Sequence, residues 1–318
     1  MTIYPTDKSI SIVIPCYNEE PNILSMYARL TKTMESVTPI YEIIYVDNCS
    51  LDNSKKLYEQ LAAKDKRVHA IIMARNFGSS DTSYTAGTEY ASGDAVVWID
   101  GDLQDPPELI SEFVKKWLMG YDVVYGVRSK RKVGRLLGWA YRMFYKTFNK
   151  YSYVQMPLYA GDFCLLDRKI VNILNKFPER DRFLRGLRAW IGFRHTGIEY
   201  TRAERTAGRA HTNIGLYFRI AKKGLISFSY APLALISNIA LVATAVSFIM
   251  LILYPLLAIW YPAPRGFLTL LVAMFFIASV QFFVLAVMGE YIARIFEEVK
   301  QRPKYIIDRI INDNKRSQ

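Results

Sequence analysis

Three aspartates that follow one short apolar segment could bind a divalent cation. The segment Ala95–Ile99 ends at Asp100, and Asp102 and Asp105 follow closely. Carboxylates in this arrangement suit a hard cation, because Mg²⁺ in proteins typically takes one or two carboxylates together with substrate phosphates. The alternative is an acidic turn that caps the helix predicted to come next. Because an Asp-x-Asp pair alone is common, the elements around it must decide between the two.

The elements that position these aspartates are predicted to be parallel strands. An apolar segment, a polar tip and a helix occur in that order four times, which is typical of a doubly wound α/β domain. Ligands in such sheets bind at the carboxyl ends of the strands, so the four polar tips should converge on one crevice. The predicted strands are Ser9–Pro15, Tyr41–Val46, Val68–Met73 and Ala95–Ile99.

The side chains at the other strand ends suit a nucleotide. Tyr17 could stack on a base, Asp47 could accept a hydrogen bond from a base N–H, and Arg75 could bind a phosphate. The first strand is not followed by Gly-x-Gly-x-x-Gly, and no phosphate loop ends in Gly-Lys-Ser/Thr, which argues against a dinucleotide fold and a P-loop NTPase. The alternatives are a helix cap for Asp47 and a half-buried aromatic residue for Tyr17.

Two long uncharged stretches predict membrane-spanning helices. Residues Leu225–Pro264 and Gly266–Gly289 contain no Asp, Glu, Lys or Arg. Each is long enough for the ~20 apolar residues that a spanning helix needs. We place the helices near Pro232–Leu256 and Phe267–Met288. A buried helical hairpin of a soluble protein is the alternative, but uncharged stretches of this length are rare in soluble folds.

The distribution of charge predicts the orientation in the membrane. The formal net charge is +12, and basic residues crowd both flanks of the predicted hairpin, whereas its turn holds only Arg265. The positive-inside rule therefore places the large domain and both termini in the cytoplasm, at the inner (plasma) membrane. The positive charge suits lipid headgroups and phosphates, and without a nucleic-acid-binding motif we expect no nucleic-acid partner. Cys16, Cys49 and Cys164 have no paired spacing, which fits a reducing cytosol.

Four motifs occur in order along the chain. They are Ile12-Val-Ile-Pro-Cys-Tyr-Asn-Glu-Glu20, Val46-Asp-Asn-Cys-Ser50, Arg75-Asn-Phe-Gly78 and Asp100-Gly-Asp-Leu-Gln-Asp-Pro-Pro107. Together they resemble the signatures of the family 2 glycosyltransferases with the GT-A fold, specifically the polyprenyl-phosphate glycosyltransferases, the branch that contains dolichyl-phosphate mannose synthase and bactoprenol glucosyltransferase. The resemblance covers nearly the whole chain, and Asn48 is a departure, because many relatives have a second aspartate there.

The resemblance implies a domain organisation. Residues 1–212 would form the cytosolic GT-A catalytic domain, an α/β doubly wound nucleotide-sugar-binding domain. A juxtamembrane amphipathic helix, 213–230, would lead to the two-helix transmembrane hairpin, 231–289. Residues 290–318 would form a cytosolic helix and tail, in which an apolar stripe would dock on a neighbour or on the membrane. The stripe consists of Ile306, Ile307, Ile310 and Ile311.

The resemblance also implies roles on the donor side of the crevice. Asp102 and Gln104 would bind Mg²⁺ or Mn²⁺ together with the diphosphate of a nucleotide sugar. The cation would neutralise the charge that develops on the departing nucleoside diphosphate. The nucleotide would be held by Pro15, Tyr17, Glu19, Asp47, Arg75 and Asp100.

The acceptor in this branch is a lipid phosphate, which is anionic and needs orientation rather than a strong base. Basic side chains should therefore surround it. Arg128 and Arg131 follow the next predicted strand, Tyr121–Gly126, and a solvated basic loop is the alternative. By match to the family motifs, Asp162 would bind a sugar hydroxyl or orient the acceptor. Arg205 would reach a phosphate at the junction of donor and acceptor.

The predicted activity is inverting, metal-dependent transfer of a hexose to undecaprenyl phosphate on the cytosolic membrane face. UDP-glucose is the preferred donor, and UDP-GlcNAc, GDP-mannose and an aminoarabinose donor remain rivals. A processive polysaccharide synthase is disfavoured, because no Gln-x-x-Arg-Trp occurs. A non-catalytic membrane scaffold that binds nucleotide sugar or lipid is the alternative of a different class. A flippase or a glycosyltransferase that uses the lipid-linked sugar in cell-envelope glycosylation would act downstream, and a homo-oligomer is left open.

Overall fold

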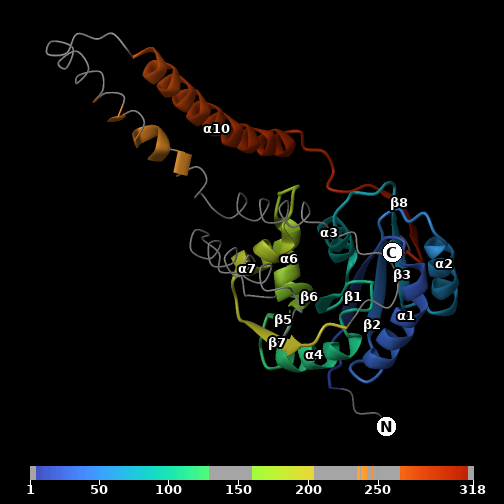
Figure 1. The fold of residues 1–318 in the computed structure, drawn as a ribbon. Coiled ribbons are helices and arrows are strands. Elements are labelled where there is room, and N and C mark those ends of the chain that lie inside the picture. The colour runs from blue at the N-terminus through green and yellow to red at the C-terminus, as the bar shows by residue number, and fades with distance from the viewer. Residues whose placement is uncertain are drawn as a thin grey trace.

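One eight-stranded sheet forms the centre of the protein in the computed structural model (Figure 1). The structure describes residues 5–128, 160–203, 235–236, 238–242, 245–246, 249 and 266–313. The order of the strands is β7-β5-β6-β4-β1-β2-β3-β8. Their bounds are β1 Ile10–Cys16, β2 Tyr41–Asp47, β3 Val68–Met73, β4 Ala95–Trp98, β5 Val123–Arg128, β6 Ala160–Asp167, β7 His195–Tyr200 and β8 Ile307–Ile311.

Helices cover both faces of the sheet, which explains why the central strands are almost entirely apolar. Side chains of β1 alternate between the two faces: Ile12 and Ile14 join the core beneath α1, α2 and α4, whereas Val13 joins the core beneath α3, α6 and α7. At Gly87 of α3, a side chain would collide with Val13, so this glycine lets α3 pack closely on β1. The helices are α1 Glu20–Met34, α2 Ser54–Lys64, α3 Ser80–Tyr90, α4 Ile110–Leu118 after the short 3₁₀ turn Pro107–Leu109, α6 Arg168–Lys176, α7 Leu184–Ile191 and α10 Phe267–Val299.

The predicted α/β architecture is confirmed, and the four predicted strands form the parallel part of the sheet. β1 pairs in parallel with β2 and β4, and β2 pairs in parallel with β3, so their carboxyl ends share one edge. The sheet as a whole is mixed rather than doubly wound and parallel. β6 lies antiparallel between β4 and β5, whereas β7 pairs in parallel with β5.

The apolar stripe near the carboxyl terminus completes the sheet, which corrects the expectation that it docks on a neighbour or on the membrane. Ile310 and Ile311 belong to β8, which pairs antiparallel with β3. Nδ1 of the buried His69 ring donates to the Asn312 carbonyl oxygen at 2.5 Å. Pairing satisfies the edge of β3 that would otherwise expose its backbone groups. The chain therefore returns from α10 to the central sheet.

One described helix is long and apolar enough to cross a membrane. It is the segment Ala273–Val299 of α10, with a mean hydropathy of 1.8. Its side chains are exposed on all sides, including Phe275 at 67% and Phe282 at 71%, as expected for a helix whose surroundings are lipid. The helix runs on past residue 289, so the predicted division there lies inside one element. The first predicted span lies largely outside the described residues.

Candidate active site

The turns that follow the parallel strands hold unusual backbone conformations. Asn18, Cys49 and Leu103 follow β1, β2 and β4 and have φ angles of 54°, 63° and 58°. Residues other than glycine adopt this left-handed region at a cost, and such residues cluster at functional sites. Gly101 keeps two of these turns close together, because an added Cβ would lie 3.0 Å from the Cys16 sulfur and 3.1 Å from the Pro15 carbonyl oxygen. The strand ends thus form one compact edge.

Asp47 carries a buried hydrogen-bond acceptor that the chain leaves unused. The residue is fully buried at the end of β2. Its Oδ2 accepts a hydrogen bond from the Ser50 backbone N–H at 2.9 Å, whereas Oδ1 has no hydrogen-bond partner among the described residues. Burial raises the pKa of Asp47. Because an unsatisfied buried acceptor costs about 1–3 kcal/mol, a ligand N–H at this position would be favoured.

Asn48 connects the ends of β2 and β3. Its side-chain Nδ2 donates to Asn76 Oδ1 at 3.1 Å, and its Oδ1 accepts from the Phe77 backbone N–H at 2.9 Å. An amide can do both, whereas an ionised aspartate only accepts. The departure from the family pattern at this position therefore has a structural role, which is to hold the turn that contains Arg75.

The remaining residues predicted to hold the nucleotide lie around this edge. Tyr17 is 37% exposed beyond β1, which leaves its ring accessible. Pro15 is paired with Val46 near the ends of β1 and β2. Glu19 precedes α1, and its carboxylate accepts from the Asn22 side chain. The structure thus places these residues near the ends of β1 and β2.

Arg75 lies in a different environment from the carboxylates. Its guanidinium stacks on the Phe77 ring, 4.1 Å from the ring centroid, and donates to the Asn76 carbonyl oxygen at 3.3 Å. It also lines a cavity with Arg180 and Arg302, at the face of the sheet covered by α3. No contact joins it to the aspartates after β4 in the part of the chain that the structure describes.

The three aspartates after β4 converge on one guanidinium that sequence analysis did not single out. Arg202 Nη2 lies 3.6 Å from Asp100 Oδ2 and 3.5 Å from Asp102 Oδ2. Its Nε lies 3.2 Å from Asp105 Oδ1. Asp105 is fully buried and Asp102 is 9% exposed. The carboxylates therefore share a position that favours positive charge.

The crowding of negative charge has a measurable consequence at Asp100. Burial, followed by repulsion from Asp105, Asp162 and Asp102, raises the pKa of Asp100 to about 7. The hydroxyl of Tyr84 donates to Asp100 Oδ1 at 2.8 Å and works in the opposite direction. A second positive charge near this cluster would relieve the repulsion.

Asp162 joins the cluster from β6. β6 is antiparallel to β4, with Trp98 opposite Cys164, and continuing this register places Asp162 beside Asp100. Asp162 is 8% exposed and accepts from Arg185 Nε of α7 at 2.6 Å. Burial would raise the pKa of Asp162, but the charge and hydrogen bonds of Arg185 outweigh it and hold the pKa below its ordinary value. Asp162 is therefore ionised and has a permanent basic partner.

Arg128 closes the cluster on the side of β5. Its Nε lies 3.3 Å from the Tyr200 hydroxyl and its Nη2 lies 3.7 Å from Asp105 Oδ2. The Tyr200 hydroxyl in turn donates to Asp105. Burial opposes the charge on Arg128, but Asp105 and Tyr200 prevail and raise its pKa. Arg128 therefore brings a fixed positive charge to the aspartates.

Gln104 links the aspartates to the segment before Arg205. Its side-chain Nε2 donates to the Ala203 carbonyl oxygen at 3.2 Å, and the Ala203 N–H donates to the Gln104 carbonyl oxygen at 3.1 Å. Its backbone N–H donates to Asp102 Oδ1 at 3.1 Å. Arg205 and Arg131 themselves lie outside the described residues.

The aspartates could supply part of the ligand set of a divalent cation, with a substrate supplying the rest. No group of three or more His, Cys, Asp or Glu side chains in the described ranges is arranged to hold a metal ion alone. Mg²⁺ and Mn²⁺ at phosphate-transfer sites take few protein carboxylates and complete their shell with phosphate oxygens. Asp102, with Asp100 beside it, supplies such a partial set, and burial followed by repulsion from the neighbouring carboxylates raises the pKa of Asp100.

Sequence reasoning missed the basic residues that pair with the aspartates. Arg185 lies on α7 with Arg188, three positions apart, which is one face of a helix. This spacing was a usable signal. Arg202 lies after β7 in residues 201–203, which form no helix or strand, and no pattern there indicates which carboxylates it meets.

Comparison with known proteins identifies the family. The model of the glycosyl transferase family 2 matches residues 11–174. An uncharacterized glycosyltransferase of Synechocystis sp. is 39% identical over 303 residues and covers 94% of both chains. The prophage bactoprenol glucosyl transferase homolog of Escherichia coli is 38% identical over 305 residues, 95% of this chain and 99% of its own. A bactoprenol glucosyl transferase of Shigella phage SfII is 38% identical over 301 residues, 94% and 97% of the two chains.

A solved structure is similar at a lower level. Glucosyl-3-phosphoglycerate synthase from Mycobacterium tuberculosis, in complex with uridine diphosphate, aligns with 69% of this chain and 79% of its own. The TM-score is 0.44 and the sequence identity is 19%, values that carry no argument about function. The family model and the relatives of nearly full length confirm the resemblance seen in the motifs: the chain belongs to the glycosyl transferase family 2 and is a glycosyltransferase.

Proposed function

We propose that this glycosyltransferase moves a hexose from a nucleotide sugar to a polyprenyl phosphate at the cytosolic face of the membrane. UDP-glucose and undecaprenyl phosphate are the preferred substrates, Mg²⁺ or Mn²⁺ is the cofactor, and the anomeric configuration is inverted. Relatives 38% identical over nearly the whole chain carry the name bactoprenol glucosyl transferase, which supports this acceptor and this sugar.

One observation carries the proposal: buried carboxylates and guanidinium groups meet at the carboxyl ends of the parallel strands. Asp102, with Asp100 beside it, would bind the cation of a metal–diphosphate complex, whereas Arg128 would attract an anionic acceptor. Opposite charges held side by side suit a reaction in which two phosphate-bearing substrates must approach each other. The unused Oδ1 of Asp47 lies at the end of β2, where a base N–H would donate to it.

The arrangement is suited to direct displacement. An oxygen of the acceptor phosphate would attack the anomeric carbon of the hexose, and the bond from that carbon to the nucleoside diphosphate would break with its electron pair leaving on the diphosphate. The cation, when bound, supplies charge neutralisation for this leaving group. Asp162, held ionised by Arg185, would accept hydrogen bonds from the sugar. Because the acceptor is already anionic, no residue needs to remove a proton from it.

The membrane part of the proposal follows from α10 and the charge pattern. A helix that could span the bilayer leads into β8 of the catalytic sheet, so that domain and that end of the helix lie on the same side. We propose two spans with the catalytic domain and both termini in the cytoplasm, as the basic flanks favour. This topology holds the crevice near the membrane surface, where a polyprenyl phosphate presents its headgroup.

The test is transfer of radiolabelled sugar into a lipid extract by the purified full chain. UDP-glucose, UDP-GlcNAc, GDP-mannose and an aminoarabinose nucleotide are compared as donors with undecaprenyl phosphate as acceptor. We expect UDP-glucose to be used best, EDTA to abolish transfer, and the product to have the opposite anomeric configuration by NMR. Asp102→Ala should reduce transfer by at least 100-fold, while Asp308→Ala, which removes an exposed aspartate of β8, should not.

The alternatives give different results in this test. Transfer that survives both EDTA and Asp102→Ala would refute the metal assignment. Binding of nucleotide sugar and lipid without transfer from any of the four donors would favour a non-catalytic scaffold. Arg128→Ala should raise the concentration of undecaprenyl phosphate needed for half-maximal rate more than it weakens UDP binding. Equal losses would place Arg128 on the donor side instead.

A further inference from the structure

A basic cavity lies where the membrane-spanning helix joins the catalytic domain. It has a volume of about 400 Å³ and is lined by three segments that are distant in sequence. These are the turn between β3 and α3, the loop before α7, and the residues that connect α10 to β8. The turn between β3 and α3 and the loop before α7 lie on the face of the sheet that is covered by α3, α6 and α7, and α10 extends from that side (Figure 1). Its basic side chains are Arg75, Arg180, Arg182, Arg302 and Lys304.

The positive charge in this cavity exceeds the negative charge. Five basic side chains line it, against the three acidic side chains of Asp81, Asp181 and Glu297. The side chains of Arg180 and Arg302 have no hydrogen bond or ion pair with any residue that the structure describes, and Arg302 is exposed. The cavity also includes Ser79 and Thr82 at the start of α3, where helix backbone N–H groups favour an anion.

Two of the cations are held against each other. Arg182 Nη2 and Lys304 Nζ both donate to the Phe177 carbonyl oxygen, at 2.6 Å and 3.0 Å. Arg182 is 4% exposed. Burial, and then the charge of Arg182, lowers the pKa of Lys304. Lys304 Nζ also lies 3.8 Å from Glu89 Oε1, and an anion in the cavity would give the two cations a further negative partner.

The position of the cavity indicates the source of the anion. Glu297 belongs to the last turn of α10, and Arg302 and Lys304 follow directly after the segment Ala273–Val299 that could cross the membrane. The cavity therefore lies at the height of lipid headgroups if α10 spans the bilayer. Basic pockets at the cytoplasmic end of transmembrane helices bind the headgroups of anionic lipids.

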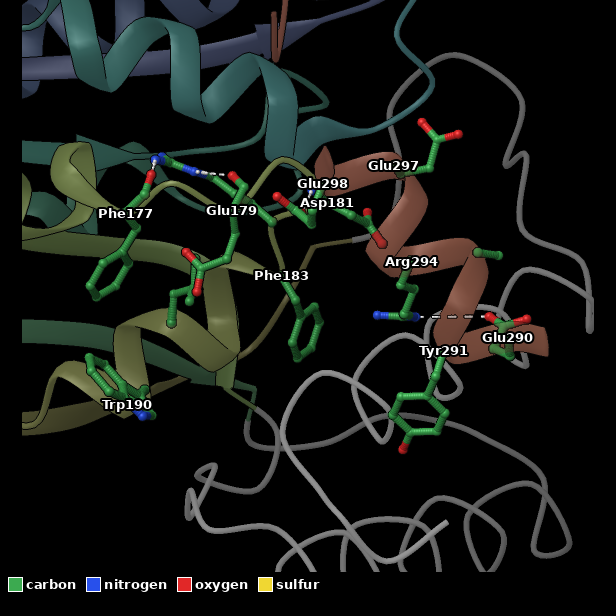
Figure 2. Close-up of a pocket in the computed structure, with 13 residues that line it drawn as sticks. Phe177, Glu179, Asp181, Phe183, Trp190, Glu290, Tyr291, Arg294, Glu297 and Glu298 are labelled. Atoms are coloured by element: carbon green, nitrogen blue, oxygen red, sulfur yellow. Dashed lines mark hydrogen bonds and ion pairs between the residues drawn. The ribbon is translucent and has the colours of Figure 1, made fainter. Parts of the chain in front are cut away.

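An adjoining cavity offers apolar surface to the rest of such a lipid. It has a volume of about 590 Å³ and shares Asp181, Arg182 and Glu297 with the basic cavity, and Glu179, Glu290 and Glu298 also line it. Figure 2 shows that Phe183 and Trp190 on one side face the end of α10, which contributes Tyr291, on the other. These aromatic side chains would not strengthen the binding of a soluble phosphate, whereas contact with the glycerol and first acyl carbons of a lipid would strengthen its binding.

We propose that the basic cavity binds the phosphate headgroup of an anionic membrane phospholipid, with the adjoining aromatic cavity contacting its glycerol and acyl chain. The site is separate from the carboxylate cluster and requires only that α10 lies in the membrane. A bound headgroup joins the β3–α3 turn to the segment after α10. It thereby fixes the height and orientation of the catalytic domain above the bilayer.

The test measures lipid binding rather than transfer, so that it is independent of the proposed function. The full chain in uncharged detergent is titrated with fluorescent phosphatidylglycerol and, separately, with fluorescent phosphatidylcholine. We expect at least tenfold tighter binding of phosphatidylglycerol. A basic side chain near anionic lipid contributes roughly fivefold in affinity, so Arg180→Gln with Arg302→Gln should weaken phosphatidylglycerol binding about 25-fold. Lys32→Gln with Lys64→Gln removes two exposed charges from α1 and α2 and should leave it unchanged.

Three outcomes would overturn the proposal. The first is equal binding of the two lipids by the unaltered chain. The second is an equal loss in both double variants, which would indicate attraction by net charge alone. The third is displacement of phosphatidylglycerol by inorganic phosphate or undecaprenyl phosphate at equal concentration, which would assign the cavity to a soluble anion or to the acceptor. Thermal melting in the same detergent checks that the Arg180→Gln and Arg302→Gln variant is folded.

Discussion

The pair formed by Asp162 and Arg185 allows a quantitative prediction about the candidate site. Arg185→Met leaves the Asp162 carboxylate 8% exposed without its bidentate partner. Breaking a buried pair costs about 3–5 kcal/mol, and a hydrogen bond to a charged group contributes about 1.5–3 kcal/mol. Because the Arg185 side chain is 33% exposed, water compensates part of the loss. We therefore expect a cost of about 2 kcal/mol, which for a domain of this size lowers the melting temperature by roughly 4–8 °C.

The assay is a double-mutant cycle in detergent, with melting followed for Arg185→Met, Asp162→Asn and both together. Removing Arg185 should cost little in the Asp162→Asn background, so the coupling should be about 2 kcal/mol. The control is Arg29→Met, which breaks an exposed bidentate pair with Glu108 and should cost about 0–1 kcal/mol.

The pH dependence provides the refuting result. The folded-state pKa of Asp162 lies below its ordinary value. The stabilisation is therefore fully present above about pH 4, and it is lost as the pH falls through the lower folded-state value. Two results would refute this reasoning. One is that Arg185→Met lowers the free energy of unfolding equally with and without the Asp162 carboxylate. The other is that this loss grows as the solution is acidified.

Three further predictions concern the strand ends. Asn48→Asp should lower the free energy of unfolding by about 1 kcal/mol, because an ionised carboxylate cannot donate to Asn76. The same variant should weaken UDP binding. Unchanged melting and unchanged UDP affinity would contradict this prediction. Gly101→Ala places a Cβ against Cys16 and Pro15, and should reduce Mn²⁺–UDP affinity in calorimetry, whereas full affinity would show that the close approach is dispensable. The raised pKa of Asp100, about 7, means that the metal displaces a proton below that pH. The Mn²⁺ affinity in the presence of UDP should then fall roughly tenfold per unit between pH 7 and pH 5.5, and a flat profile would contradict this.

Much of the catalytic domain could be predicted from local sequence. The strands from Ile10 to Trp98 are apolar because helices cover both faces, and each is followed by a turn and a helix. That pattern fixes which ends of the strands share an edge, so the position of Asp47, Asp100 and Asp102 at one edge of the sheet followed from it. Local sequence does not show whether β6 runs parallel or antiparallel to its neighbours, because that depends on the connection between β5 and β6. The mixed sheet was missed for this reason.

The basic partners of the aspartates could not be predicted from local sequence either. Arg185 meets Asp162 because α7 packs on β6, and Arg202 meets three aspartates because the segment after β7 crosses the ends of the other strands. Such contacts join residues that are far apart in the chain, and no spacing predicts them. The stripe around Ile310 was recognised as apolar, but its partner, β3, could be identified only in the folded chain.

The central claim is that the aspartates after β4 hold a divalent cation together with the diphosphate of the donor. Electron paramagnetic resonance of Mn²⁺ measures this directly, because bound and free Mn²⁺ give different signals. In the unaltered chain we expect one Mn²⁺ to bind when UDP is present, and Asp102→Asn to weaken that binding at least 100-fold. Mn²⁺ binding that is independent of UDP, or equally tight in Asp102→Asn, would contradict the account.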